Sequence, residues 1–361
     1  MYSHDNRIVI TLDAGGTNFV FGAMRANEFI VEPVTVPSNA HDLDLCLQTM
    51  VRGFREIIDR LNEQPAAISF AFPGPADYPN GIIGGYLPNF PSFRDGVALG
   101  PFLEMTFGIP VFINNDGDLF AYGEALGGAL PEVNARLEKA GSSKRYRNLL
   151  GYTFGTGFGV GMVVDGRLNR GDNSCVETFC LRHKKLPDVI VEEGVAVRAV
   201  KRVYGELAGC PDHGLEPKDI CDIADGTRPG DAEAAKKAFA ELGEIAGDAM
   251  ATAVTLTDGL IVIGGGITAA RTYIMPALLR ELRSKMRTRR ARTRTDEGLR
   301  SGRRGGVRSV RARRYATVAG LRLRPLRCLR PTEARRRHDF EARRQPRHLG
   351  RRLCFRTLHV G

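Results

Sequence analysis

The sequence predicts an α/β protein with two related halves, and a repeated pattern carries this prediction. A strand, a glycine turn and a returning strand occur near the N-terminus and again about 140 residues later. Helical segments and further short apolar strands follow each pair. We therefore expect an N-terminal α/β domain over residues 1–117, a C-terminal α/β domain over 118–286, and a separate tail over 287–361.

In the first half, β-branched and other apolar residues mark strands, and apolar side chains at helical spacing mark helices. The glycine turn at residues 14–16 separates the first two strands. The expected strands cover residues 7–13, 19–24, 66–72 and 110–113, and the expected helices cover 42–61 and 119–130.

The second half restarts the pattern, with expected strands at residues 148–154 and 158–164 around a second glycine turn. Helical spacing returns over residues 193–207 and 231–256. A wholly apolar strand at 259–263 then runs into three consecutive glycines. No element is predicted beyond residue 287.

The seven cysteines are scattered and contain no Cys-x-x-Cys pair, which suits a reducing compartment. The N-terminus lacks the pattern of a secretory signal, and no apolar run reaches the length of a membrane span. We expect a cytoplasmic protein without a membrane partner. The sequence is compatible with a homo-oligomer and does not specify one.

The tail differs in charge from the rest of the chain. Residues 287–361 hold 25 Arg, no Lys and five acidic residues, a net charge of +20, whereas residues 1–286 carry −9. We favour an out-of-frame reading of a GC-rich gene over a nucleic-acid-binding arm, because natural basic arms usually mix Lys with Arg; a solvated tail is the third alternative. Any nucleic-acid binding by this segment is expected to be non-specific and salt-sensitive.

The first glycine turn, Asp13-Ala-Gly15-Gly16-Thr17-Asn18, has the composition of a phosphate-binding turn. Glycine lets backbone N–H groups approach phosphate oxygens without a Cβ in the way, and Thr17 and Asn18 add side-chain donors. Asp13 could hold Mg²⁺ through water. The alternative is a tight hairpin turn that needs glycine for conformational reasons alone.

Two further glycine segments suit a nucleotide. Gly155-Thr156-Gly157 repeats the first turn in the second half, so that the two turns could hold a phosphate chain from both sides. Gly264-Gly265-Gly266 follows a buried strand, where a base or ribose could lie against bare backbone. A turn or a close strand pairing explains either segment without a ligand.

Asn114-Asn115-Asp116 follows the strand at 110–113. A carboxylate at a strand end could accept the proton of an attacking hydroxyl, which makes Asp116 a candidate general base. The alternative is a helix N-cap, because Asn and Asp are favoured at that position.

The order and spacing of six motifs resemble the ROK family of sugar kinases over roughly residues 7–285. The motifs are Asp13-x-Gly-Gly-Thr17, Pro73-Gly74-Pro75, Pro88-Asn89, Asn115-Asp116 with Gly123-Glu124, Gly155-Thr156-Gly157-x-Gly159, and Gly264-Gly265-Gly266. The resemblance implies an actin-like, ribonuclease-H-like fold with duplicated α/β domains around an ATP cleft. It also implies Mg²⁺-dependent transfer of phosphate from ATP to a hexose, with glucose as the default substrate.

The resemblance also assigns residues to the sugar. Gly74, Asn89, Asn115 and Asp116 would line it, with Asp116 as the catalytic base. Glu177 and Glu192 match the positions of two glutamates that contact the sugar in the family. Asn and carboxylate oxygens suit these roles, because each accepts one or two hydrogen bonds from sugar hydroxyls.

The sequence departs from the family where the second glutamate motif ends. Cys180 replaces the histidine of the Glu-x-x-His motif, and the cysteine-rich zinc segment is missing between Arg182 and Glu192. Cys175, Cys180 and His183 would supply three ligands where a structural zinc takes four, so we expect no zinc.

Two other functions are compatible with parts of the sequence. One is a non-catalytic sugar-sensing regulator or pseudokinase of the same fold, although no helix-turn-helix precedes Asp13. The other is a dehydrogenase, because Gly264-x-Gly266-x-x-Ala269 matches a dinucleotide fingerprint. That motif lies late in the chain and lacks a ribose-binding acid at the expected distance.

Overall fold

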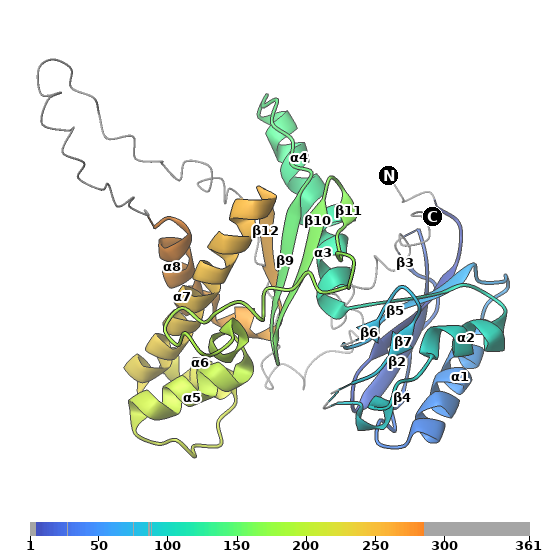
Figure 1. The fold of residues 1–361 in the computed structure, drawn as a ribbon, viewed down its shortest axis with the longest axis horizontal. Helices are drawn as coiled ribbons and strands as arrows, with labels where there is room; N and C mark the ends of the chain where they lie inside the picture. The colour runs from blue at the N-terminus through green and yellow to red at the C-terminus, as the bar shows by residue number, and fades with distance from the viewer. Residues whose placement is uncertain (1–4, 27, 75, 86, 88, 285–361) are drawn as a thin grey trace, which may run out of the picture. The chain divides into compact units, whose positions relative to one another are not determined.

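The computed structural model describes residues 5–26, 28–74, 76–85, 87 and 89–284 (Figure 1). The predicted tail over 287–361 lies outside these residues. The described chain forms two compact units. Among the described residues, the first takes in those up to Leu181 and Val254–Ala269, and the second takes in Arg182–Ala253 and residues 270–284. The boundary predicted at residue 117 falls inside the first unit and stays a prediction.

The first unit contains a sheet of strand order β3-β2-β1-β5-β8, with β4 also paired to β2. Its central strand β1 runs antiparallel to β2 and parallel to β5. The strands are β1 (Val9–Ala14), β2 (Asn18–Arg25), β3 (Glu28–Phe29), β4 (Val34–Pro37), β5 (Ala67–Ala71) and β8 (Val111–Asn114).

A second sheet in the same unit has the order β11-β10-β9-β12. Here β9 runs antiparallel to β10 and parallel to β12, so the arrangement around β1 is repeated around β9. This repetition confirms the predicted α/β fold with a duplicated hairpin. The strands are β9 (Leu149–Phe154), β10 (Phe158–Val164), β11 (Arg167–Leu168) and β12 (Leu260–Gly264).

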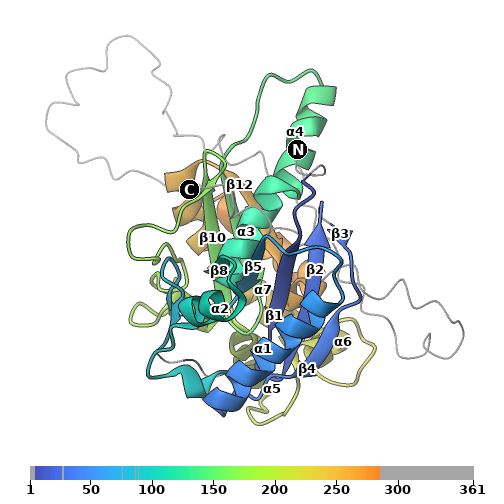
Figure 2. The same cartoon turned by 90° about the vertical axis from the view of Figure 1, so that its right-hand side faces the viewer.

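Helix α1 (Leu43–Asp59) lies against the first sheet (Figure 2). Asp42 caps it by accepting a hydrogen bond from the Leu45 N–H at 3.0 Å. The Phe54 ring of α1 meets the Phe21 ring of β2 edge to face, with 5.0 Å between centroids. The other elements of this region are β6 (Ala76–Asp77), β7 (Ile82–Ile83), η1 (Pro91–Phe93) and α2 (Leu99–Phe107).

The helix predicted over residues 119–130 is two helices, α3 (Asp116–Leu126) and α4 (Ala129–Lys139). Helix α3 starts earlier than predicted because Asn115 caps its N-terminus. The helical segment is interrupted at Gly127-Gly128, where glycine favours helix termination. Helix α3 packs on the second sheet through buried apolar side chains, including Ala121 and Tyr122 against Leu149 and Val163.

The helices of the second unit, one of them a short 3₁₀ helix, follow an irregular loop at residues 182–190. The helices predicted at 193–207 and 231–256 correspond to α5 and α7. Helix α6 is short and begins with a capping box between Glu216 and Asp219, and neither it nor α8 was predicted. The elements are η2 (Val191–Gly194), α5 (Val197–Ala208), α6 (Pro217–Ala224), α7 (Ala232–Thr257, whose end enters the first unit) and α8 (Arg271–Leu282), while η3 (Gly266–Ala270) links β12 to α8.

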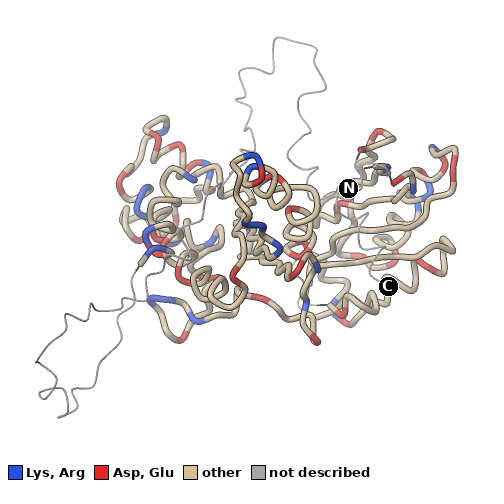
Figure 3. Tube along the Cα trace, turned by 90° about the horizontal axis from the view of Figure 1, so that it is seen from above, with Lys and Arg blue, Asp and Glu red and all other residues tan. Residues whose placement is uncertain are grey.

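Basic and acidic residues are interspersed along the described chain (Figure 3). Among the helices of the described ranges, none combines the length and apolar character needed to cross a membrane.

Candidate active site

The first glycine turn connects β1 to β2 and is held from one side by Ser38. The Gly15 N–H donates to the Asn18 carbonyl at 3.1 Å, which closes the turn. Buried Ser38 donates its hydroxyl to the Gly16 carbonyl at 2.5 Å and its N–H to the Thr17 carbonyl at 2.9 Å. Ser38 was not singled out from the sequence, because nothing local relates it to a turn more than twenty residues earlier.

The second glycine turn lies beside the three consecutive glycines. The Gly155 N–H donates to the Gly157 carbonyl at 3.1 Å, and Gly264 stands in register with Thr153 of β9. Gly265 has a φ of +93°, and a Cβ there would lie 2.3 Å from the Phe154 carbonyl oxygen. The second glycine turn and the Gly264-Gly265-Gly266 segment, both predicted to bind the nucleotide, therefore lie next to each other in space. That the first and second turns face each other stays a prediction.

Asp116 lies where the chain passes from β8 of the first sheet to α3 on the second. Asn115 is the N-cap of α3, with φ −65° and ψ 150°, and its Oδ1 accepts from the Gly117 N–H at 2.7 Å. Both interpretations of this motif are thus compatible, because Asn115 serves as the cap and leaves Asp116 exposed at the first helical position. Part of the Asp116 side chain reaches solvent, but protein packed around its carboxyl group reduces hydration and raises its pKa, which the Gly117 N–H opposes.

Tyr78, which follows the Pro-Gly-Pro segment, joins several of the predicted sugar residues. Its hydroxyl donates to the Phe72 carbonyl at 3.0 Å and accepts from Asn115 Nδ2 at 3.4 Å. A Cβ added to Gly74 would stand 2.7 Å from the same hydroxyl, so Gly74 also lies against it. Sequence reasoning missed Tyr78, whose only local signal is its place after Gly74.

The charges around Tyr78 place two further predicted residues. Burial raises the pKa of Tyr78, and the carboxylates of Asp116, Asp118 and Glu177 raise it further. Glu177, which lies on an irregular segment, is thus close enough to act electrostatically on the same hydroxyl. Gly74 and Asn115 therefore lie against the Tyr78 hydroxyl, and Asp116 and Glu177 lie within electrostatic range of it.

The remaining predicted residues lie elsewhere. An added Cβ on Gly16 would stand 2.9 Å from the Asn89 Cβ, so Asn89 lies next to the first glycine turn. Asp13 is exposed at the end of β1, opposite Val20. Glu192 belongs to the second unit, where its carboxylate accepts from Arg198 at 2.9 Å.

Sequence reasoning also missed Asp118 and Arg170. Asp118 lies one half-turn beyond Asp116 and is 8% exposed. Burial is the main cause that raises the pKa of Asp118; Arg170 opposes the rise, Asp116 adds to it, and the resulting pKa is about 7. Arg170 Nη1 donates to Asn114 Oδ1 at 3.1 Å, across 56 positions of sequence. The position of Asp118 two residues after the Asn114-Asn115-Asp116 motif was a usable signal, whereas nothing in the sequence indicated Arg170.

We expect Asp118→Asn to change the pH dependence of stability. The pKa of Asp118 is higher in the folded protein than in the unfolded chain. The folded state therefore loses stability as pH rises from about 4 to about 7 and the carboxyl group ionises. The amide carries no such charge, and the variant should gain roughly 2–4 kcal/mol over wild type at pH 8 compared with pH 4. Unfolding followed by circular dichroism at both pH values tests this. An equal difference between the two proteins at pH 4 and pH 8 would contradict it.

The cysteines beside Glu177 lie at the surface. Cys175 and Cys180 are free and exposed, and their sulfurs point to the carbonyls of Asn173 and Glu177. Within the described ranges, no three His, Cys, Asp or Glu side chains are arranged to hold a metal ion.

Comparisons with known proteins place the chain in a family. The model of the ROK family matches residues 9–179. A crystal structure of glucokinase from Parabacteroides distasonis is 64% identical, with a TM-score of 0.73, and the match covers 78% of this chain and 79% of that one. Glucokinase from Thermotoga maritima is 27% identical over 73% of this chain and 83% of its own length.

A ROK family glucokinase from Streptomyces griseus, solved with glucose and AMPPNP, has the same fold, with a TM-score of 0.57 at 21% identity over 77% of this chain and 90% of that one. The chain belongs to the ROK family. The predictions of a sugar kinase of this family and of the actin-like fold are confirmed.

Proposed function

We propose that this protein transfers the terminal phosphate of ATP to a hydroxyl of a hexose, with glucose as the default substrate. The observation that carries the proposal is the contact of Gly74 and Asn115 with the Tyr78 hydroxyl, with Asp116 and Glu177 within electrostatic range of it. It is supported by 64% identity to a glucokinase over most of both chains.

In the proposed reaction the hexose hydroxyl oxygen attacks the terminal phosphorus of ATP, its proton passes to the Asp116 carboxylate, and the bond to ADP breaks. A raised pKa suits Asp116 to accept that proton. Asn89, Asn115, Glu177 and Glu192 are proposed to bind the sugar hydroxyls.

The glycine segments are proposed to hold ATP. Gly15, Gly16, Gly155 and Gly157 would turn backbone N–H groups toward the phosphates, with Thr17, Asn18 and Thr156 adding side-chain donors. The bare backbone of Gly264-Gly265-Gly266 would face the nucleoside. The exposed carboxylate of Asp13 fits a Mg²⁺ ion held through water, and bound Mg²⁺ would neutralise phosphate charge.

The test is a coupled assay of ADP formation with the full chain across glucose, mannose, fructose, galactose and N-acetylglucosamine. We expect hexose-dependent ADP formation that requires Mg²⁺, with the highest kcat/KM on glucose. ATP hydrolysis that no sugar stimulates, or binding of sugar and ATP without turnover, would contradict the proposal. Preference for another hexose would correct only the substrate.

A further inference from the structure

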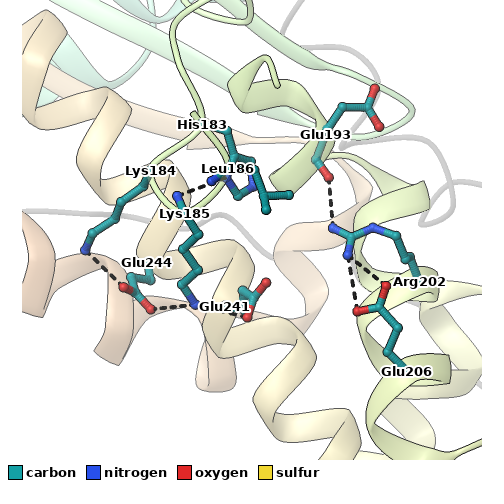
Figure 4. Close-up of polar contacts among 9 residues, drawn as sticks. All are labelled: His183, Lys184, Lys185, Leu186, Glu193, Arg202, Glu206, Glu241 and Glu244. Atoms are coloured by element: carbon teal, nitrogen blue, oxygen red, sulfur yellow. Dashed lines mark hydrogen bonds and ion pairs between the residues drawn. The ribbon is translucent and has the colours of Figure 1, made fainter. Parts of the chain in front are cut away.

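Residues 183–190 form a closed loop in the second unit, and the His183 ring organises it. The His183 N–H donates to the Val189 carbonyl at 2.8 Å, and Arg182 pairs with Ile190 as a β-bridge. Inside the loop, His183 Nδ1 accepts two backbone hydrogen bonds, from the N–H groups of Lys185 and Leu186, each at 3.1 Å (Figure 4). The imidazole thus takes the place of a backbone acceptor.

These two hydrogen bonds define the protonation state of the ring. An imidazole nitrogen that accepts cannot carry a proton, so His183 must be neutral with its proton on Nε2. The residue is 2% exposed, and Nε2 has no hydrogen-bond partner among the described residues. A buried N–H without a partner is costly, so packing against its neighbours must hold the ring in this position.

Nε2 points at the backbone of Gly194. A Cβ added to Gly194 would lie 2.5 Å from His183 Nε2 and 2.6 Å from Ile245 Cδ1 of α7. Gly194 is the last residue of η2, the short 3₁₀ helix that also contains Glu192 and Glu193. The imidazole ring therefore packs between the 183–190 loop, whose backbone N–H groups donate to it, and the η2 turn, which contains Glu192.

Ion pairs fasten the same loop to α7. Lys184 Nζ lies 3.0 Å from a Glu244 oxygen and 2.7 Å from a Glu281 oxygen of α8. Lys185 Nζ lies 3.0 Å from Glu241 and 3.2 Å from Glu244 (Figure 4). These side chains are partly exposed, so each pair adds little stability alone, but together they restrict where the loop can go.

We propose that His183 is a positioning residue for Glu192: its neutral ring caps the 183–190 loop, packs against Gly194 and holds the turn that presents Glu192 to the hexose. The contact with the hexose rests on the proposed function. The placement of the turn does not, and the two can be measured separately.

Protonation should release this arrangement. A proton on Nδ1 would remove the acceptor of both backbone hydrogen bonds. The charged groups that face the ring are Glu193 of η2, Arg202 of α5, Glu241 of α7 and Lys185 of the loop itself. Burial is the largest influence and lowers the pKa of His183, opposed by the two glutamates.

The sign of the pH effect follows from this direction. A histidine with a lowered pKa in the folded loop contributes stability above its ordinary pKa of about 6.5, and that stability is lost as pH falls toward the lower folded value. The loop and the Glu192 turn should therefore loosen on acidification below about pH 6.5.

The experiment compares wild type, His183→Asn, His183→Ala and His213→Asn in the full chain. The Asn side chain places an acceptor near the position of Nδ1 and does not titrate, so it should restore the cap without the pH response. His213 is the matched control, because its Nδ1 also accepts a backbone N–H, that of Leu215 at 2.9 Å, and its Nε2 lies 2.9 Å from the Lys201 carbonyl oxygen.

The first readout is hydrogen-exchange protection between pH 5.5 and 8, corrected for intrinsic rates. The reporters are the amides of Lys185, Leu186 and Val195, the last of which donates to the Glu192 carbonyl at 3.0 Å. We expect acidification to lower their protection in wild type, His183→Ala to lower it at every pH, and His183→Asn and His213→Asn to keep it. Unchanged protection of Val195 in His183→Ala would overturn the proposal.

The second readout is the KM for the hexose against the KM for ATP. We expect His183→Ala to raise the hexose KM about tenfold, equivalent to about 1.4 kcal/mol, with little change in the KM for ATP. Because Asp116 and Asp118 also titrate with raised pKa values, His183→Asn should keep a smaller rise in hexose KM below about pH 6.5 than wild type shows. A rise in hexose KM as large in His183→Asn as in wild type would overturn the proposal. If wild type phosphorylates no hexose, the proposed function fails, and the exchange at Val195 still decides the role of His183.

Discussion

Replacing Asp116 with Asn should abolish hexose phosphorylation while leaving the protein folded. In wild type the Gly117 N–H donates a hydrogen bond to Asp116 Oδ1 at 2.9 Å. The amide keeps the shape of the side chain and an oxygen that can accept this hydrogen bond. It cannot take up the proton of the attacking hydroxyl, so we expect kcat to fall by about 10²–10⁴. Hexose affinity should stay within about tenfold, because the hydrogen-bonding shape persists.

Stability should move in the opposite direction. The pKa of Asp116 is raised in the folded protein, so its carboxylate costs stability at neutral pH, and that cost disappears in the amide. We expect Asp116→Asn to unfold at a temperature no lower than that of wild type at pH 7.5. Asp44→Asn, the same change at an exposed position in the first turn of α1, is the matched control and should keep full activity. Near-wild-type kcat in Asp116→Asn would exclude Asp116 as the base.

Replacing Gly265 with Ala should disrupt the proposed nucleotide site and the fold around it. The new Cβ would stand 2.3 Å from the Phe154 carbonyl oxygen and 2.6 Å from the Phe154 nitrogen, both backbone atoms at the end of β9. The φ of +93° adds strain for any residue with a side chain. We expect a loss of about 3–5 kcal/mol of stability from overpacking and strain together.

The effect on ATP should follow from the same displacement. Moving β12 away from Phe154 also moves the end of β9, from which the Gly155 turn departs, so we expect ATP affinity to fall at least about tenfold. Calorimetric titration and thermal unfolding measure the two effects. Gly266→Ala is the control, because its Cβ would enter open space. Equal ATP affinity and stability in the two variants would refute the role of the Gly265–Phe154 contact.

Several features of this protein were readable in the sequence because local chemistry decides them. Both hairpins follow from apolar strands on either side of glycines, and the structure has them at Val9–Arg25 and Leu149–Val164. Asn115 and Asp116 were identified from adjacent residues whose two roles, cap and carboxylate, are both local. The six motifs in order sufficed to identify the family.

Other features depend on contacts between segments that are distant in the chain. Arg170 reaches Asn114 across 56 positions, and Gly265 lies against Phe154 because β12 pairs with β9. The clustering of Gly74, Asn115, Asp116 and Glu177 required Tyr78, which carries no motif of its own. His183 resembled a metal ligand in the sequence and is a backbone cap in the fold.

The physical reason for this division is the range of the interactions. Turn formation, helix capping and strand propensity are decided within a few residues, so composition and spacing reveal them. Burial, electrostatic shifts and close backbone approaches depend on which segments the topology brings together. The sequence alone therefore determined the elements, the family and the candidate base. Only the tertiary structure decided which side chains surround that base, what raises its pKa, and how the loop before Glu192 is held.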